Sequence, residues 1–482
     1  AEYAEQKLGI EGYAEKFYHY MARGYYSLSS PIWSNFGLDR GLSISCFGSY
    51  IGDSINAIMS TVAEIGVMSK LGGGTSGYFG DIRPRGSNIT NNGKSNGSFA
   101  FTKLFEATID TISQGTSRKG MFAGYIDIDH GDIEEWLDIH TEGNPIQLMY
   151  YGVCVSHEWL ESMKAGDPYK RQIWAKLLQR KTETGIPYIF FKDNANAGRP
   201  DVYKDRNMMI HASNLCSEIA LPSSEDESFV CCLSSMNLLY FDEWKDTDAP
   251  EVLTYFLDIV MSEFIAQSAN IQFMDKANKF ARRHRALGLG VLGWHSYLQS
   301  KNMAFDSFEA MQHNNMIFKL LQEKTLKASK ELAQRFGEPE ILKGYGRRNT
   351  TLMSVAPTKS SSFILGSVSP SIEPFKSNYY VKDLSKIKVV YKNPFLEALL
   401  KRKGLDRDDI WESILLNDGS VQHLTELTED EKEVFKTFSE ISQLSVIQQA
   451  AQRQKYIDQG QSVNIMVHPA TPTKDLNQLY LT

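Results

Sequence analysis

The sequence predicts an α/β fold. Two runs rich in aromatic and aliphatic residues, 121–129 (MFAGYIDID) and 185–191 (GIPYIFF), have the length and composition of strands. Helical patterns flank them, with apolar residues at three- and four-residue spacing over 55–68, 252–277 and 307–336. Because strands and helices alternate along the chain, we expect them to build one α/β architecture.

Local signals place the elements of the N-terminal part. Residues 1–30 have a helix-like pattern with several aromatic side chains. Asp53 and Ser54 are residue types that commonly begin a helix, and they directly precede the pattern at 55–68. That helix leads into a glycine-rich loop at 70–87, and a second loop at 113–120 precedes the first strand-like run.

The C-terminal part has two further local signals. Residues 354–367 (SVAPTKSSSFILGS) predict a strand, a polar turn and the start of a helix. Residues 388–416 predict a small strand-plus-helix insertion. We find no internal repeat and no low-complexity linker, so nothing divides the chain cleanly into modules.

Composition excludes several classes of protein. The chain has 482 residues and a net charge of −7, which gives no overall basic footprint for nucleic acid or an anionic membrane. It contains no uninterrupted apolar run long enough to span a bilayer. Five cysteines in a chain of this length argue against a secreted disulfide scaffold. We therefore expect a cytoplasmic protein with reduced thiols.

The stretch NLCSEIALP (214–222) carries the most informative chemistry. It places an amide, a thiol and a carboxylate at two-residue spacing, on Asn214, Cys216 and Glu218. In an extended segment, which Pro222 and the preceding polar run favour, all three side chains would point to one face. A lone buried cysteine is more often a small apolar residue, but these flanking groups weaken that reading. A Cys-His hydrolase is disfavoured, because His211 would point away from the Cys216 face.

Eight segments, in order along the chain, resemble the large catalytic subunit of ribonucleotide reductase, most closely that of class I. They are SISCFGSYIGDS (43–54), GDIRPRGS (80–87), SQGTSR (113–118), NLCSEIALP (214–222), VCCLSSMNL (230–238), RRHRALGLGVLGWHSYLQ (282–299), APTKSSSFILGSVSPSIEP (356–374) and RQKYIDQGQSVN (453–464). The resemblance implies a ten-stranded α/β barrel made of two antiparallel halves of five parallel strands, with a finger loop inside. We expect an N-terminal helical segment at 1–38, the barrel at 39–482 and the small insertion at about 375–435.

The resemblance also implies a radical mechanism. Cys216 would become a thiyl radical that takes the 3′-hydrogen of a ribonucleoside diphosphate. Glu218 would act as general base on the 3′-hydroxyl, and Asn214 would hydrogen-bond the sugar hydroxyls. The reducing dithiol maps onto Cys46 and Cys231. Aligning LSSMNL (233–238) with the family's strand places the redox cysteine two residues before Leu233, at Cys231. Cys232 would then face outward and pack against helices.

Substrate and effector sites follow from the same resemblance. The substrate diphosphate would lie at the turn 357–361, at a helix N-terminus. The substrate-binding residues are Ser30, Ser45, Gly74, Pro357, Ser360 and Ser361. Lys359 departs from the family, which usually has a small polar residue or glycine there. The allosteric effector would be bound by Asp53 on its ribose and Arg83 on its phosphates, with Gln114 and Arg118 on the loop that relays its identity.

Partners and cofactors are implied in the same way. The chain itself would hold no cofactor or metal, its effectors would be ATP and dNTPs with Mg²⁺, and the radical would come from a metal-containing small (beta) subunit. We expect a homodimer through the effector-site helices and a thioredoxin- or glutaredoxin-type reductant. The chain ends at NQLYLT, before the family's paired tyrosines and C-terminal cysteines, so a second polypeptide could supply these. It also begins too close to the barrel to include the family's N-terminal nucleotide-binding cone.

Two other functions remain open at this point. Without the tyrosine pair, a cobalamin-dependent class II reductase is an alternative, although RRHRALGLGVLGW and RQKYIDQGQS favour class I. A nucleotide sensor that keeps the barrel but has lost turnover is the second. The five retained residues Cys46, Asn214, Cys216, Glu218 and Cys231 argue against it, since a sensor would not need all of them.

Overall fold

Five parallel strands form one half of a barrel in the computed structural model, which describes all residues except 39, 45, 116–118, 385–386 and 469–470. They pair in chain order. The strands are β2 (Cys46–Tyr50), β3 (Gly74–Tyr78), β4 (Met121–Asp127), β5 (Tyr150–Val155) and β6 (Tyr188–Phe191). The strands expected around 121–129 and 185–191 are thus confirmed as β4 and β6.

The second half of the barrel joins the first in antiparallel orientation. Strand β7 (Phe229–Asn237) pairs antiparallel with β2 and parallel with β8 (Leu287–Leu292). Isolated parallel bridges, Leu289 to Met353 and Val355 to Gln461, continue the sheet beyond β8. The α/β barrel with two antiparallel halves is therefore confirmed. Its second half consists, in the described part of the chain, of two full strands and two bridged segments.

Two local expectations were wrong, because β3 lies inside the glycine-rich loop expected at 70–87 and a further strand lies in the expected N-terminal helical region. Within the region expected to be helical, residues Tyr26–Leu28 form β1, which pairs antiparallel with the C-terminal end of β7. Most of the rest of that region is helical, with α1 at Glu2–Leu8 and α2 at Tyr13–Ala22, and α3 follows at Ser30–Asn35. The tyrosine-rich sequence before β1 suits a buried strand as well as a helix, and all three β1 residues are buried.

Helices cover the outside of the first half-barrel. They are α4 (Ile55–Lys70), α5 (Ser98–Thr111), α6 (Ile133–Trp136), α7 (His157–Ala165) and α8 (Pro168–Thr184). Ser54 caps α4 as its sequence predicted, because its Oγ accepts a hydrogen bond from the backbone N–H of Ala57 at 3.1 Å. Beneath these helices lies an apolar cluster that includes Ile65, Phe105 and Trp136.

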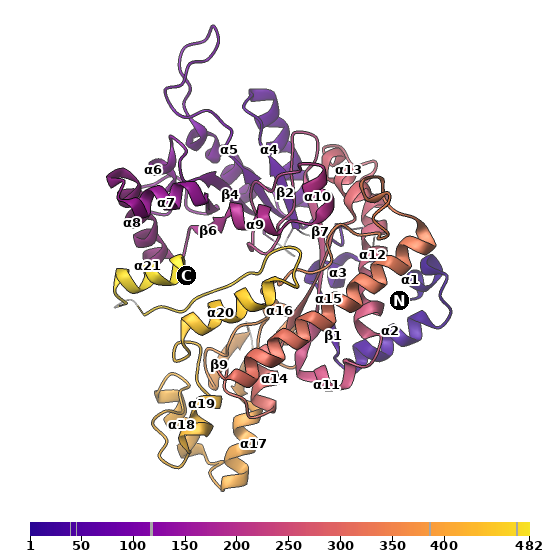
Figure 1. Cartoon of the computed structure of the whole chain (residues 1–482), viewed down its shortest axis with the longest axis vertical. Coiled ribbons are helices and arrows are strands. Elements are labelled where there is room, and N and C mark those ends of the chain that lie inside the picture. The colour runs from indigo at the N-terminus through magenta and orange to yellow at the C-terminus, as the bar shows by residue number, and fades with distance from the viewer. Residues whose placement is uncertain (39, 45, 116–118, 385–386, 469–470) are drawn as a thin grey trace.

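A second group of helices packs against β7 and β8. Its longest members are α12 (Ala249–Ser268), α13 (Asp275–His284) and α15 (Phe308–Phe336). The N-terminal helices α1 and α2 lie against α12 (Figure 1). The ring of Phe17 stacks on that of Phe256 at 4.4 Å, and both belong to the main apolar cluster. The N-terminal helices therefore share this core.

The single helix expected over 252–277 is in fact two helices, so the prediction of a continuous helix was wrong. The chain turns between α12 and α13, where Phe273 has a positive φ of 66°. The Nδ2 group of Asn278 donates hydrogen bonds to Ile265 O and Ser268 Oγ, both at 2.8 Å. A side chain from α13 thus satisfies the C-terminal end of α12 and stabilises the break.

The insertion has an apolar cluster of its own. It comprises the antiparallel hairpin β9 (Tyr379–Leu384) and β10 (Ile387–Lys392), followed by α17 (Pro394–Lys403), α18 (Asp408–Leu416) and α19 (Glu429–Val434). Leu400, Trp411 and Phe435 belong to this cluster. Figure 1 shows α17 and α18 at the end of the molecule opposite α4 and α5. The separate core supports our proposal that residues 375–435 form a subdomain.

The remaining helices are short connectors and C-terminal elements. They are α9 (Lys192–Gly198), α10 (Asp201–Asp205), α11 (Phe241–Trp244), α14 (Trp294–Ser300), α16 (Lys359–Ile364), α20 (Gln443–Gln454) and α21 (Thr473–Leu481). In the part of the chain that the structure describes, no helix is both long and apolar enough to cross a membrane.

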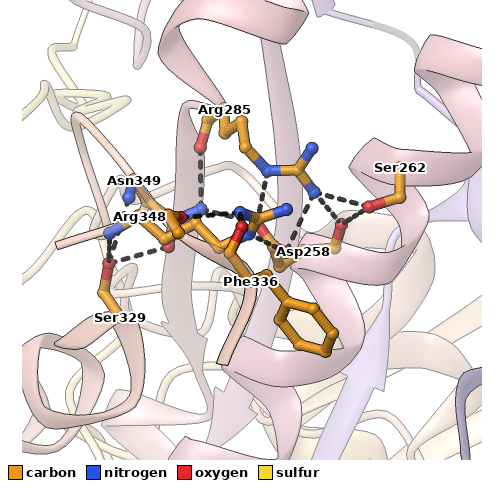
Figure 2. Close-up of polar contacts among 8 residues, drawn as sticks. Asp258, Ser262, Arg285, Ser329, Phe336, Arg348 and Asn349 are labelled. Carbon is orange, nitrogen blue, oxygen red and sulfur yellow. Dashed lines mark hydrogen bonds and ion pairs between the residues drawn. The ribbon is translucent and has the colours of Figure 1, made fainter. Parts of the chain in front are cut away.

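A buried ionic network fixes the start of two segments of the second half-barrel (Figure 2). Asp258 on α12 binds Arg285 through two hydrogen bonds of 2.8 and 2.9 Å and Arg348 through one of 2.9 Å. Asn349 donates to the same carboxylate at 2.9 Å and accepts from Ser329 on α15 at 2.8 Å. Arg285 lies just before β8, and Arg348 and Asn349 just before the bridged segment at 353–355. The network therefore sets where both segments enter the barrel.

Candidate active site

Two cysteines face each other where the half-barrels join. Cys46, the first residue of β2, lies directly opposite Cys231 of β7 in the antiparallel register. Directly opposite residues of antiparallel strands have Cα atoms about 4.5–5.5 Å apart and side chains on the same face. That separation lies within the range a disulfide requires, roughly 4.4–6.8 Å. The two thiols can therefore form a disulfide without a rearrangement of the backbone.

The neighbouring cysteine points elsewhere. Cys232 pairs with Leu287 on the parallel β8, and adjacent residues of a strand face opposite sides. Burial raises the pKa of the Cys232 thiol well above its usual value, with smaller contributions from Cys46 and from Asp258 on α12. The register that places Cys231, and not Cys232, opposite Cys46 agrees with the alignment of LSSMNL.

The segment that carries Cys216 is a turn, so the expectation of an extended segment was wrong. The backbone N–H of Ser217 donates to Asn214 O at 3.2 Å, and Ser217 has a positive φ of 66°. Asn214 Oδ1 accepts hydrogen bonds from the backbone N–H groups of Glu218 and Ile219, each at 3.1 Å. The amide side chain, more than strand geometry, therefore holds this turn in shape.

Glu218 is almost fully buried, at 1% exposure. Burial raises the pKa of its carboxyl from 4.5 to about 7, against an opposing effect of hydrogen bonds from its own backbone and Asn214. Its Oε2 atom has no hydrogen-bond partner among the described residues. A buried carboxyl with one unpartnered oxygen and a pKa near neutrality can exchange a proton with a bound molecule.

The cysteines and the Glu218 carboxyl influence one another's environment. Burial raises the pKa of Cys231, and the neighbouring Cys46 and Glu218 raise it further, whereas a hydrogen bond from Gln459 lowers it. Burial likewise raises the pKa of Tyr188, with added contributions from Cys216 and Glu218. Gln459 also contacts both parts, since its Nε2 lies 3.3 Å from Cys231 Sγ and its Oε1 accepts from Ala220 N, two residues after the turn, at 3.3 Å.

Several residues without an assigned role from the sequence hold the turn. Ser354 Oγ donates to Glu218 O at 2.8 Å, and Tyr125 OH donates to Asn214 O at 2.7 Å. Gly460 N donates to Glu218 O at 2.9 Å, and a Cβ at Gly460 would lie 2.9 Å from that same oxygen. Only glycine permits this close approach. Ser354, Gly460 and Gln459 lie in or next to quoted motifs, but their partners are far away in the sequence.

A cavity of about 750 Å³ opens beside Cys216. Its lining includes Tyr188, Pro357, Lys359 and Asn464. The thiol that the sequence singled out and the turn expected to bind phosphate thus border the same cavity. Its volume lies in the range of small-molecule sites, roughly 300–1,000 Å³. Among the residues that the structure describes, no group of three or more His, Cys, Asp or Glu side chains is placed to hold a metal ion.

The turn at 357–361 begins the short helix α16. Its N-cap, Thr358, has a positive φ of 49°, and Thr358 Oγ1 accepts a hydrogen bond from Ser371 N at 2.8 Å. Ser360 is exposed, whereas Ser361 is buried and its Oγ donates to Leu28 O at 3.3 Å. Of these two serines, only Ser360 therefore presents its side chain openly.

The other expected substrate residues are placed differently. Ser30 is exposed at the start of α3, and Gly74 is buried at the start of β3, next to Cys46 in the sheet. Gly74 therefore borders the cysteine pair. Ser45 lies outside the described residues.

The two principal effector residues bind each other. Arg83 Nε donates to Asp53 Oδ2 at 2.7 Å, Arg83 N donates to Asp53 Oδ1 at 3.2 Å, and Arg83 also contacts Asn88 O at 2.9 Å. Both side chains remain about one-third exposed. Gln114 Nε2 donates to Asn35 Oδ1 at 3.2 Å, and Arg118 lies outside the described residues. Asp53 and Arg83 thus lie together in front of α4.

Comparisons with known proteins decide the family. The description "Ribonucleotide reductase, barrel domain" belongs to a family model that matches residues 44–170, 168–341 and 338–482. The chain belongs to the ribonucleotide reductase family. This confirms the family and the type of enzyme expected from the sequence.

Three relatives illustrate the similarity. The solved class Id ribonucleotide reductase alpha subunit of Actinobacillus ureae is 81% identical, with a TM-score of 0.95, over 100% of this chain and 89% of that one. A protein of frog virus 3 (isolate Goorha), assigned as a ribonucleoside-diphosphate reductase large subunit, is 34% identical over 94% of this chain and 82% of its own length. The ribonucleoside-diphosphate reductase large subunit of invertebrate iridescent virus 3 is 32% identical over 98% of this chain and 86% of its own length. The structural relative is a class I enzyme, which favours class I over class II.

Proposed function

We propose that this chain reduces ribonucleoside diphosphates to deoxyribonucleotides with a thiyl radical on Cys216. Cys216 takes the 3′-hydrogen of the ribose, and Glu218 accepts the proton of the 3′-hydroxyl. Asn214 hydrogen-bonds the sugar hydroxyls. Once C3′ carries the radical, the 2′-hydroxyl takes one proton from the dithiol of Cys46 and Cys231 and leaves as water. The two electrons and the second proton of the dithiol reduce C2′, and the two sulfurs become a disulfide. Glu218 returns its proton to the 3′-oxygen. Cys216 then returns its hydrogen to C3′.

The observation that carries this proposal is the placement of Cys46 opposite Cys231, with the Glu218 carboxyl beside them. A two-electron reductant needs two thiols at disulfide distance, and the register provides them. A proton acceptor needs a pKa near the working pH, and burial gives Glu218 a value of about 7. These two features support the assignment of Cys46, Cys231 and Glu218 to the reaction.

Substrate and effector positions remain proposals. The diphosphate would bind at Pro357, Ser360 and Ser361, with Ser30, Ser45 and Gly74 near the sugar. Lys359 lines the same cavity and can attract the phosphates. An effector of the ATP or dNTP type, with Mg²⁺, would bind between Asp53 and Arg83 and insert its ribose and phosphates into their ion pair. Gln114 and Arg118 would relay its identity to the substrate base.

The partners follow from the same assignment. A small beta subunit would supply the radical, and a thioredoxin- or glutaredoxin-type protein would supply reducing equivalents. Homodimerisation would use α4, where Ile55 is 63% and Met59 is 49% exposed. Such exposed apolar side chains in the first turns of a helix suit an interface. A cytoplasmic location stays a prediction from the cysteine content.

Substitution of Cys216 by serine tests the proposal. An O–H bond is too strong to exchange hydrogen with the sugar, whereas the size and polarity of the side chain change little. We therefore expect Cys216→Ser to lose deoxynucleotide formation and to keep nucleotide binding. The assay measures product with candidate radical-generating subunits, and it includes the wild type without them. Residual activity within about tenfold of the wild type, roughly 1.4 kcal/mol in barrier, would contradict the radical role.

A further inference from the structure

The two sulfur atoms of the cysteine pair have unequal surroundings. Cys231 lies inside β7 at 1% exposure, whereas Cys46 begins β2 and is only partly buried. If the two form a disulfide, an external thiol therefore has access to Cys46 and very little to Cys231. Thiol–disulfide exchange requires direct attack on one sulfur, and the other sulfur departs as a thiolate. Burial thus selects Cys231 as the leaving sulfur.

A buried thiolate needs a hydrogen-bond donor, and one is in place. Gln459 Nε2 lies 3.3 Å from Cys231 Sγ, and it also donates to Leu287 O at 2.9 Å and to Thr351 Oγ1 at 3.0 Å. A side-chain amide has two N–H bonds for these three acceptors. Sulfur in a thiol is a weak acceptor, but a thiolate takes part in a charge-assisted hydrogen bond. The amide can therefore turn toward the sulfur when it becomes charged.

The other end of the same amide holds Gln459 in position. Its Oε1 accepts a hydrogen bond from Ala220 N at 3.3 Å, in the segment that follows the catalytic turn. Gln459 itself is buried at 4% exposure. Gly288, across the strand pair, leaves room around the thiol, because a Cβ there would lie 3.2 Å from Cys231 Sγ. The donor is thus fixed beside the sulfur before any charge forms.

We propose that the Cys46–Cys231 disulfide is reduced in one direction, with Gln459 as the residue that receives the departing Cys231 thiolate. A thiolate of an external dithiol attacks Cys46 Sγ, a mixed disulfide forms there, and the bond to Cys231 Sγ breaks. The second thiolate of the dithiol then attacks the dithiol's first sulfur, which is bonded to Cys46 Sγ. This closes the disulfide of the reductant and releases the Cys46 thiolate. The dithiol loses two electrons, the protein disulfide gains them, and the two protons of the dithiol pass to the two cysteines.

This inference rests on the proposed function for its biological setting, but its test does not. The protein is oxidised with diamide in the absence of nucleotide, and a disulfide between Cys46 and Cys231 is checked by peptide mapping. The oxidised wild type is then treated briefly with a monothiol and quenched with an alkylating reagent, which caps the released cysteine before it can attack the mixed disulfide. We expect the monothiol on Cys46 in at least about a tenfold excess over Cys231. A failed reductase assay would leave this measurement intact.

The second measurement assigns the role of Gln459. Gln459→Met keeps the length of the side chain and removes the N–H donor, so we expect reduction by dithiothreitol to slow by about tenfold or more. Gln449→Met is the matched control, because Gln449 is also buried but its amide contacts Trp294 and the Phe305 carbonyl. Its reduction rate should stay within about twofold of the wild type. Equal slowing in both variants would overturn the role of Gln459.

The wild-type protein alone can overturn the direction of reduction. A monothiol found on Cys231, or equally on both cysteines, would show that burial does not select the leaving sulfur. This outcome is independent of whether the Gln459→Met variant folds.

Discussion

Replacing Glu218 by glutamine should change stability and activity with pH in a way that no exposed carboxylate would. Burial raises the pKa of Glu218 from 4.5 to about 7, so the folded protein keeps this proton after the unfolded chain has lost it. The stabilisation is complete below about pH 4.5 and is lost as the pH rises through 7. At roughly 1.36 kcal/mol per pH unit, the loss amounts to about 3 kcal/mol. Glu218→Gln removes this titration.

The difference between variant and wild type isolates Glu218 from other titrating groups. Between about pH 4 and about pH 8, the free energy of unfolding of Glu218→Gln should rise by about 3 kcal/mol relative to that of the wild type. Denaturant unfolding at both pH values measures it. Where acid unfolding is irreversible, the infrared absorption of the protonated Glu218 carboxyl can be followed against pH instead. Subtracting the spectrum of Glu218→Gln isolates this band. In the wild type, kcat/KM should fall below pH 7 as the base becomes protonated.

A pH-independent difference between the two proteins would refute this reasoning. It would mean that Glu218 is already ionised at pH 5, so that water or an ion reaches the Oε2 atom that has no described partner. A carboxyl band that titrates near pH 4.5 would lead to the same conclusion. Loss of turnover in Glu218→Gln without the stability effect would support a catalytic role but not the raised pKa.

Three further tests, two of them with a matched control substitution, probe other parts of the structure. Asp258→Asn should destabilise the fold by about 3–5 kcal/mol in thermal or denaturant unfolding, because it leaves the buried Arg285 and the partly buried Arg348 without their carboxylate. Asp248→Asn, which removes a partly exposed ion pair, should cost less than about 1 kcal/mol. Cys231→Ser should lose dithiol-driven turnover while Cys232→Ser keeps it, and the reverse pattern in a product assay would show the register to be wrong. Arg83→Ala should weaken dNTP binding and blur substrate preference while basal turnover changes little; unchanged preference with all four effectors would contradict the effector site.

Local sequence signals predicted elements whose causes are themselves local. Ser54 caps α4 because its side chain meets an N–H three residues away. By contrast, the turn at 214–218 was mistaken for an extended segment. Two-residue spacing does not reveal that Asn214 Oδ1 folds back onto the N–H groups of Glu218 and Ile219. The break between α12 and α13 was missed for a similar reason, since Asn278 caps a helix that ends ten residues earlier.

Contacts distant in sequence limited the prediction of the site. The resemblance placed Cys46 and Cys231 together, and the β2–β7 register agrees with it. Gln459 was part of a quoted motif but had no role, because its partners Cys231, Leu287 and Thr351 come from three other segments. Hydrogen-bond geometry of this kind depends on the packing of the whole barrel. Residue type and spacing alone do not report it.

The join between the half-barrels explains why the cysteine pair lies there. In the described structure, β2 and β7 are where a strand of one half meets a strand of the other, and their antiparallel pairing puts two side chains at disulfide distance. That distance depends on the position of the second half, whose segments enter the barrel at the Asp258 network. A shift of β7 by one residue would replace Cys231 by Cys232 and turn the thiol away from the site. The buried ionic network therefore helps to set the geometry on which the proposed redox chemistry depends.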